Sequence, residues 1–262
     1  MTAIALSPAR TRRHGVATMV RLAAMDVRLM LREPMVVVGL LGFPLATVLV
    51  LAGVFGQAPD PEFGGVAPDD HYLAGYIGVV IGALGLITIP VHIATGRELG
   101  VTRRFRASGV SAGTMVGSEI LVGVVLGTAS VLVVLAAGTA VYGLSAPVDP
   151  LGVAGWYVAG LVCFIAIGCA LGSLVPTARS AAALGNLIYV PMFLLGGGGP
   201  PRQVMTGAMS TLSDLLPLSH LVGGLRLAWL GQTDDPHLLW WPLTVAAIAV
   251  TFAVASARRR AG

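Results

Sequence analysis

Six long apolar stretches constrain the fold of this chain more than any other feature of its sequence. Each is close to the roughly 20 residues that an α-helix needs to cross the hydrocarbon core of a bilayer. Of the 262 residues, 56% are hydrophobic and 11% are charged, against about 25% charged in a soluble domain. We therefore expect an all-α integral membrane protein with six transmembrane helices. The expected spans are residues 35–56, 72–93, 115–142, 153–175, 180–195 and 238–257.

The arginines divide between the two sides of this predicted membrane domain. All sixteen basic residues are Arg, and fourteen lie before residue 33, in the 97–106 loop, in the 176–179 turn or after residue 257. Eight of the twelve acidic residues lie in the opposite loops. Because cytoplasmic loops are rich in basic residues, we expect both termini in the cytoplasm and a multi-pass protein of the bacterial plasma membrane. Scattered arginines without interleaved aromatic residues argue against a nucleic-acid partner.

The N-terminal region predicts a helix that lies in the membrane interface. Residues 17–32 have a helical period, with a basic face and an apolar face, which is typical of a helix at a membrane surface. The alternative is a plain soluble helix before the first span. The basic face contains Arg21, Arg28 and Arg32, and the apolar face contains Val20, Ala24, Val27 and Leu31. We divide the chain into a flexible cytoplasmic tail (1–16), a transmembrane domain (17–257) and a second cytoplasmic tail (258–262).

The segment 196–235, between the fifth and sixth spans, contains apolar pieces that are too short to cross a bilayer. Prolines at 200, 201 and 217 divide it. We expect short re-entrant helices on the outer side, supported by protein rather than lipid. Gly-x-x-x-Gly spacings at 78/82, 123/127 and 168/172 predict close packing of helices within the bundle.

A short basic segment, residues 97–117, separates the second and third spans. Its sequence is RELGVTRRFRASGVSAGTMVG, with four arginines at its start. Arginine at the centre of a bilayer costs roughly 2.5–3.5 kcal/mol even on lenient scales, so the segment must be a cytoplasmic loop. It serves either as a contact surface for a partner or simply as a solvated loop.

Two motifs give the chain a resemblance to a known family. The 97–111 segment is similar to the cytoplasmic loop of the ABC type-2 exporter permeases, with Glu98 at that loop's acidic position. LPLSHLVGGLR at 216–226 is similar to their outer signature, and the order of spans agrees from about residue 17 to 257. Two positions depart from the pattern: Gly109 stands where members often have Pro, and Arg103 where they have a second acid.

This resemblance implies a permease subunit that is driven by a separate ATPase. The 97–111 segment would form a coupling helix that docks on the nucleotide-binding subunit, and the N-terminal helix would be a second contact. ATP and Mg would be bound by the partner, because a chain without lysine cannot hold a Walker-type phosphate loop. We expect no cofactor, metal or catalytic residue in this chain. The residues expected to couple to the ATPase are Arg97, Glu98, Leu99, Arg103, Arg104, Phe105 and Arg106.

The expected activity is efflux of a lipophilic or amphipathic substrate such as a drug, an antibiotic or a lipid-like metabolite, hence a role in multidrug efflux or antibiotic resistance. Two permease copies, identical or different, would form the pathway. The rival classes are a secondary transporter or a membrane enzyme that acts without an ATPase. The chain has no H-E-x-x-H or G-x-S-x-G motif and lacks the matched broken helices of many secondary transporters.

Five further residues are candidates for the pathway or for coupling. Glu119 is an acid in the third span, where it serves structure and coupling or handles substrate and protons. His92 lies just before the basic segment and is an interfacial histidine or part of a kink that transmits motion. In the outer motif, Pro217 divides the segment, while His220 and Arg226 either meet a substrate head group or make structural hydrogen bonds.

Overall fold

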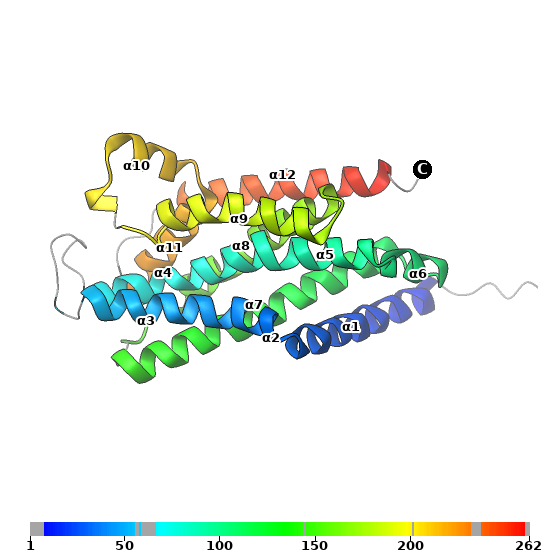
Figure 1. Ribbon diagram of the computed structural model, residues 1–262, viewed down its shortest axis with the longest axis horizontal. Helices are drawn as coiled ribbons and strands as arrows, with labels where there is room; N and C mark the ends of the chain where they lie inside the picture. Colours follow the sequence, from blue (N-terminus) through cyan, green and yellow to red (C-terminus); the bar gives the residue numbers. More distant parts are fainter. Residues whose placement is uncertain are drawn as a thin grey trace, which may run out of the picture.

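The computed structural model describes residues 8–55, 58, 67–143, 145–200, 202–231 and 237–259. Within these ranges the chain is helical almost throughout and forms no strand, so the expected all-α fold is confirmed for them. The long helices run roughly along one axis, with α6 (Val101–Ala107) at one end of the bundle and α10 (Gly207–Asp214) at the other (Figure 1).

Four helices of the described part of the chain are long and apolar enough to cross a membrane: Asp70–Glu98, Ala112–Tyr142, Pro150–Leu174 and Ala178–Leu195. They correspond to the second to fifth expected spans. The first expected span is helical as α2 (Pro34–Val37), η1 (Val38–Gly42) and α3 (Phe43–Phe55), and its last residue, 56, lies outside the described residues. The sixth is α12 (His237–Arg259), which has a shorter apolar stretch at Leu239–Thr251.

The helix Asp70–Glu98 is the centre of the bundle, and a widened turn divides it. It consists of α4 (Pro68–Ala83), a π-helical segment η3 (Leu84–Thr88) and α5 (Ile89–Glu98). Pro90 lacks the N–H that would bond to the carbonyl of Leu86, and its ring crowds that carbonyl, so the preceding turn widens. The π segment η1 likewise ends two residues before Pro44. Proline position therefore explains both irregular turns.

At η3 the central helix meets its neighbours backbone to backbone. A Cβ on Gly85 would lie 2.3 Å from the carbonyl oxygen of Phe164 in α8 (Pro150–Leu174), and one on Gly168 would lie 2.4 Å from the carbonyl oxygen of Gly85. A Cβ on Gly185 of α9 (Ala178–Leu195) would lie 2.2 Å from the Leu86 carbonyl oxygen. Such close approach needs small residues and gives strong dispersion contact without a hydrophobic driving force. The glycines thus pack helices of one chain together.

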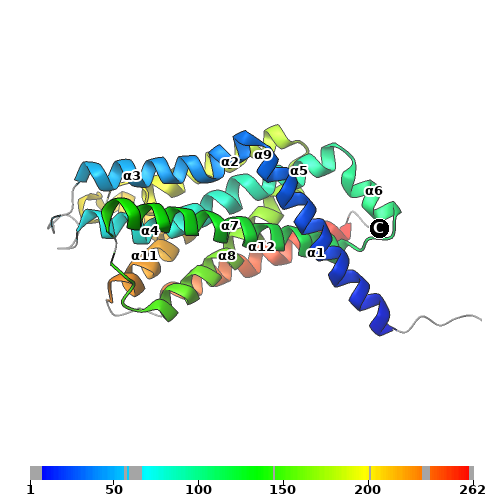
Figure 2. The ribbon, with the colours of Figure 1, turned by 90° about the horizontal axis from the view of Figure 1, so that it is seen from below.

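Helix α1 (Pro8–Arg32) begins nine residues before the helix expected at residue 17, so the part of the expected tail from Pro8 to residue 16 is helical. Proline fits the first turn of a helix because its missing N–H needs no partner there. Residues 1–7 lie outside the described part. In Figure 2, α1 runs obliquely across the end of the bundle that carries α6.

The face of α1 toward the bundle is not the apolar face that the sequence period predicted. Val20 and Leu31 are 51% and 53% exposed, whereas Ala23 and Met30 are buried. Met19 packs against α7 (Ala112–Tyr142), where its sulfur occupies the space that a side chain at Gly117 would need. The helical period of the sequence identified one apolar stripe of α1. A second apolar stripe, which includes Ala23 and Met30, faces the rest of the protein.

Two short helices follow α9, as expected. Helix α10 (Gly207–Asp214) is mostly exposed, whereas α11 (Pro217–Leu230) buries eight residues against α4, α8 and α12. Helix α12 packs most extensively against α8 and extends to Arg259. The expected C-terminal tail, 258–262, is therefore helical at its first two residues, and 260–262 lie outside the described part.

Candidate functional site

A short helix, α6 (Val101–Ala107), forms the middle of the basic segment. Gly100 and Gly109 flank it with φ angles of 71° and 84°, a left-handed conformation that glycine adopts at little cost. Ser111 then caps α7, because its side chain accepts a hydrogen bond from the backbone N–H of Thr114. The segment is thus a helix between two sharp turns at the end of the bundle.

Helix α6 presents a basic, partly apolar surface. Arg103, Arg104 and Arg106 are exposed, and Phe105 is half-buried. Leu99, at the turn before α6, is 66% exposed. These are the side chains that the sequence predicted would meet an ATPase, and their placement on the surface leaves them accessible for that role.

Arg97 and Glu98 also make contacts within the chain. Arg97 donates hydrogen bonds from Nη1 to the carbonyl oxygens of Gly172 and Ser173, at 2.6 and 3.0 Å. These carbonyls end α8, where a cation is favoured by the helix dipole. Glu98 Oε2 accepts a hydrogen bond of 3.0 Å from the backbone N–H of Ala178, the first residue of α9. The two neighbours therefore join the end of α5 to the turn between α8 and α9.

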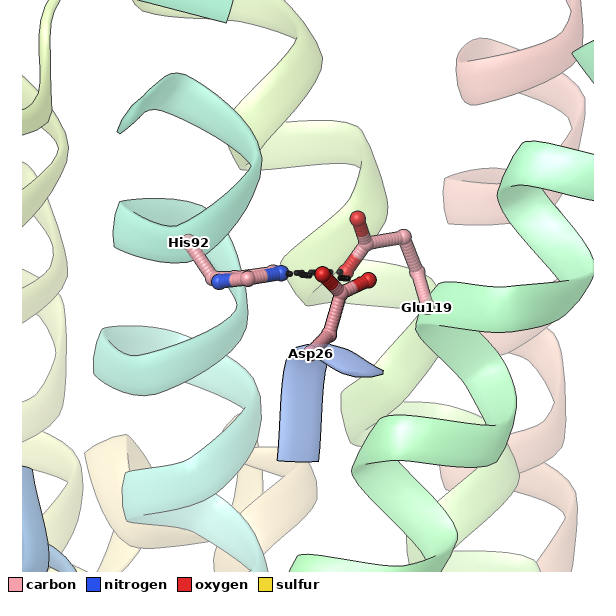
Figure 3. Close-up of side chains that lie close together, drawn as sticks. All are labelled: Asp26, His92 and Glu119. Carbon is pink, nitrogen blue, oxygen red and sulfur yellow. Dashed lines mark ion pairs between the residues drawn. The ribbon is translucent and has the colours of Figure 1, made fainter. Parts of the chain in front are cut away.

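Glu119 and His92, which the sequence flagged separately, lie together in space (Figure 3). His92 Nε2 is 3.7 Å from Glu119 Oε2 and 3.8 Å from Asp26 Oδ2. The three side chains are 16–22% exposed and come from α5, α7 and α1. Asp26 was not among the residues that the sequence predicted. The available signal was that Asp26 is the one acid among residues 1–32.

These residues line a cavity of about 1930 Å³ at the α6 half of the bundle. Its wall comes mainly from α1, α5, α6, α7, α8 and α9, and apolar side chains predominate among the lining residues. Asp26, His92 and Glu119 are grouped on that wall, and Arg97 and Phe105 lie at it as well. The cavity is therefore a mainly apolar space in which one imidazole and two carboxylates lie close together.

Comparison with known proteins identifies the family. The profile of the ABC-2 type transporter membrane domain matches residues 19–230, most of the chain. The chain belongs to the ABC-2 type transporter family. A search of curated proteins found no match.

As an ABC-2 membrane domain, the chain is a transport permease component, and permeases of this family typically work with ATPase subunits. The matched region begins in α1 and ends at the last residue of α11. It therefore contains α6, the Asp26–His92–Glu119 cluster and the outer motif, and α12 extends the bundle beyond it.

The outer motif of this ABC-2 permease forms internal contacts. Pro217 is the first residue of α11 and is buried. Arg226 donates from Nε to the carbonyl oxygen of His71 and from Nη2 to that of Gly197, both at 2.9 Å. His220 Nδ1 lies 3.1 Å from the carbonyl oxygen of Leu216, and its ring lies beside Trp241. Of the two roles left open for Arg226 and His220, these contacts match structural hydrogen bonding.

Proposed function

We propose that this chain is the transmembrane permease subunit of an ATP-driven exporter, with ATP hydrolysed on a separate nucleotide-binding subunit. The observation that carries the proposal is α6, a short basic helix held outside the spans between two left-handed glycines. An anchored helix can transmit force, whereas a solvated loop cannot. Family membership supports the presence of an ATPase partner.

The proposed topology has six spans with both termini in the cytoplasm of a bacterial cell. The end of α12 lies at the same end of the bundle as α6, and α10 lies at the opposite end (Figure 1). The Arg-rich segments thus gather at one end, as expected for the cytoplasmic side. Helices α10 and α11 are then on the outer side, with α11 entering the bundle as a re-entrant helix.

The contacts of α5 define a route for coupling. Motion of α6 is passed to the end of α5, and Arg97 and Glu98 pass it to the α8–α9 turn. His92, one turn earlier on α5, faces Glu119 of α7 and Asp26 of α1. Closure of the ATPase subunits against α6 would therefore move several spans together, which is the hinge type of transition that such machines use.

The proposed substrate is lipophilic or amphipathic, such as a drug, an antibiotic or a lipid-like metabolite. The cavity of about 1930 Å³ is larger than the roughly 300–1,000 Å³ of an ordinary ligand pocket, and its wall is mainly apolar. A second permease copy, identical or different, would form the pathway together with this chain.

Charge reversal on α6 tests this proposal. Tagged permease is expressed in its host, and co-purifying chains that carry a phosphate-binding loop are identified by mass spectrometry. ATP-dependent uptake of a fluorescent lipophilic dye is then measured in inverted vesicles. We expect Arg103→Glu with Arg104→Glu to lose the ATPase and to abolish uptake. The matched control is Arg202→Glu, an exposed arginine at the opposite end of the bundle that pairs with Asp214, and it should retain both.

Two results contradict the proposal. One is normal ATP-dependent transport by the α6 double variant. The other is transport by the wild type in vesicles that lack ATP but keep a proton gradient, which favours a secondary transporter.

A further inference from the structure

The cluster of Asp26, His92 and Glu119 brings one imidazole and two carboxylates together from three separate helices (Figure 3). We propose that it binds a divalent first-row transition-metal ion such as Zn²⁺ or Mn²⁺. Neither the family nor the proposed transport cycle requires this site, so the inference does not depend on the proposed function.

The spacing of the three ligand atoms favours a bridging ion over direct contact. The distances of 3.7 and 3.8 Å from His92 Nε2 to the two carboxylates exceed the 2.7–3.2 Å or so of an N–H···O hydrogen bond. Metal bonds of about 2.0–2.2 Å place two tetrahedral ligands roughly 3.3–3.6 Å apart. All three ligand atoms lie within 4.8 Å of one another, so movements of about 1 Å or less in each side chain bring them to the spacing that metal bonds of this length require.

The chemistry of the donors selects the class of metal. Two carboxylates balance the charge of a divalent ion, which matters because the side chains are only 16–22% exposed and uncompensated charge at such depth is costly. An imidazole nitrogen suits Zn²⁺, Fe²⁺ and Ni²⁺, and carboxylate oxygens also suit Mn²⁺, whereas Mg²⁺ and Ca²⁺ prefer oxygen ligands alone. The site should therefore discriminate against the abundant hard cations.

The cavity supplies access and the remaining ligands. All three residues lie on its wall, so an ion can reach them and water can complete the coordination shell, as in metal sites with an open position. With a metal bound, α1 is fastened to α5 and α7. Without it, only the imidazole of His92 joins the two carboxylates, at distances of 3.7 and 3.8 Å, so we expect a weaker link between α1 and the spans.

The experiment uses full-length permease in lipid nanodiscs, stripped of metal with a chelator. Zn²⁺ is titrated against a chromophoric competitor, Co²⁺ is used as a spectroscopic probe, and amide hydrogen exchange of α1 is followed in parallel. We expect one Zn²⁺ per chain at micromolar affinity or tighter, no displacement by excess Mg²⁺, and slower exchange around Asp26. His92→Gln and Asp26→Asn should each weaken binding by about tenfold or more, the scale of losses seen even for outer-shell changes.

Two further variants distinguish loss of the metal site from a general disturbance of folding. His92→Cys retains a metal ligand and should regain binding with a thiolate-to-Co²⁺ absorption band, which a purely structural histidine would not produce. Glu33→Gln removes another acid of the same cavity and should leave binding unchanged. The proposal is overturned if wild-type permease binds no Zn²⁺ in the micromolar range, or if the cluster variants bind as tightly as the wild type. Either result would leave a water-bridged ion pair in place of a metal site.

Discussion

Arg226 shows how one side chain of the outer motif can hold three segments together. Its guanidinium reaches carbonyls of α4 and of the turn after α9 from a position on α11. A Cβ on Gly75 of α4 would lie 2.8 Å from Arg226 Nη2, so the guanidinium of Arg226 can pack closely on α4 only because residue 75 has no side chain. We infer that Arg226 stabilises the packing of α11 against α4 and the turn after α9.

Arg226→Gln should therefore destabilise the permease. Loss of two hydrogen bonds from a charged donor predicts a cost of about 1.5–3 kcal/mol each, since the two carbonyls are left without this partner. Thermal unfolding can be followed with a thiol-reactive dye, because Cys163 is buried and Cys169 is half-buried. Arg202→Gln, which breaks only the exposed pair with Asp214, should cost less than about 1 kcal/mol. Equal melting temperatures for the two variants would refute this role.

Two glycines of the central helix provide a matched pair for testing backbone packing. At Gly85 an added methyl group meets the Phe164 backbone at 2.3 Å, whereas at Gly96 it meets nothing within 4 Å. Gly85→Ala should lower stability by about 3 kcal/mol or more, because neither backbone can move aside without strain. Gly96→Ala should be neutral or stabilising by up to about 1 kcal/mol, since alanine is the better helix former. The same dye assay measures both, and a tolerated Gly85→Ala would show that the π segment yields easily.

At the scale of elements, the junction of α5 with the α8–α9 turn depends on Glu98. Its carboxylate accepts from the N–H of Ala178 at the positive end of α9, beside the capping box of Thr177 and Ser180. Glu98→Gln should weaken this contact by about 1 kcal/mol, which is roughly a fivefold faster amide exchange at the start of α9. Hydrogen-exchange mass spectrometry checks it, with Glu33→Gln as the control. Unchanged protection in Glu98→Gln would mean that the turn is held by its own cap alone.

The sequence predicted the elements better than their contacts. Spans are encoded locally by apolar length, and α7, α8 and α9 begin within three residues of their expected starts at 115, 153 and 180. The early start of α1 was missed because an Arg-rich segment carries no apolar period. The bonds of Arg97 and Glu98 join residues 75 to 80 positions apart, and no periodicity encodes such distances.

The candidate site also depends on contacts between distant residues, which local sequence patterns do not encode. His92 and Glu119 were recognised because polar side chains in apolar segments stand out. Asp26 was not, since an acid in a basic, amphipathic helix resembles an ordinary solvated residue. Only the packing of α1 on α7 brings it to the other two. A site built from three helices is a property of the tertiary structure.

For the whole molecule, α6 and α10 lie at opposite ends of the bundle (Figure 1), and this arrangement predicts which side of the membrane each helix faces. If the α6 end is cytoplasmic, a cysteine at Arg104 must be reached only from the inside, and one at Met209 of α10 only from the outside. Both side chains are exposed, and replacing Cys163 and Cys169 by alanine removes the background. Labelling of intact cells and of inverted vesicles with a membrane-impermeant maleimide compares the two positions. We expect Met209→Cys to react in intact cells and Arg104→Cys only in inverted vesicles. The reverse pattern would place α6 outside the cell, away from any supply of ATP, and an ATPase could then not drive this permease through α6.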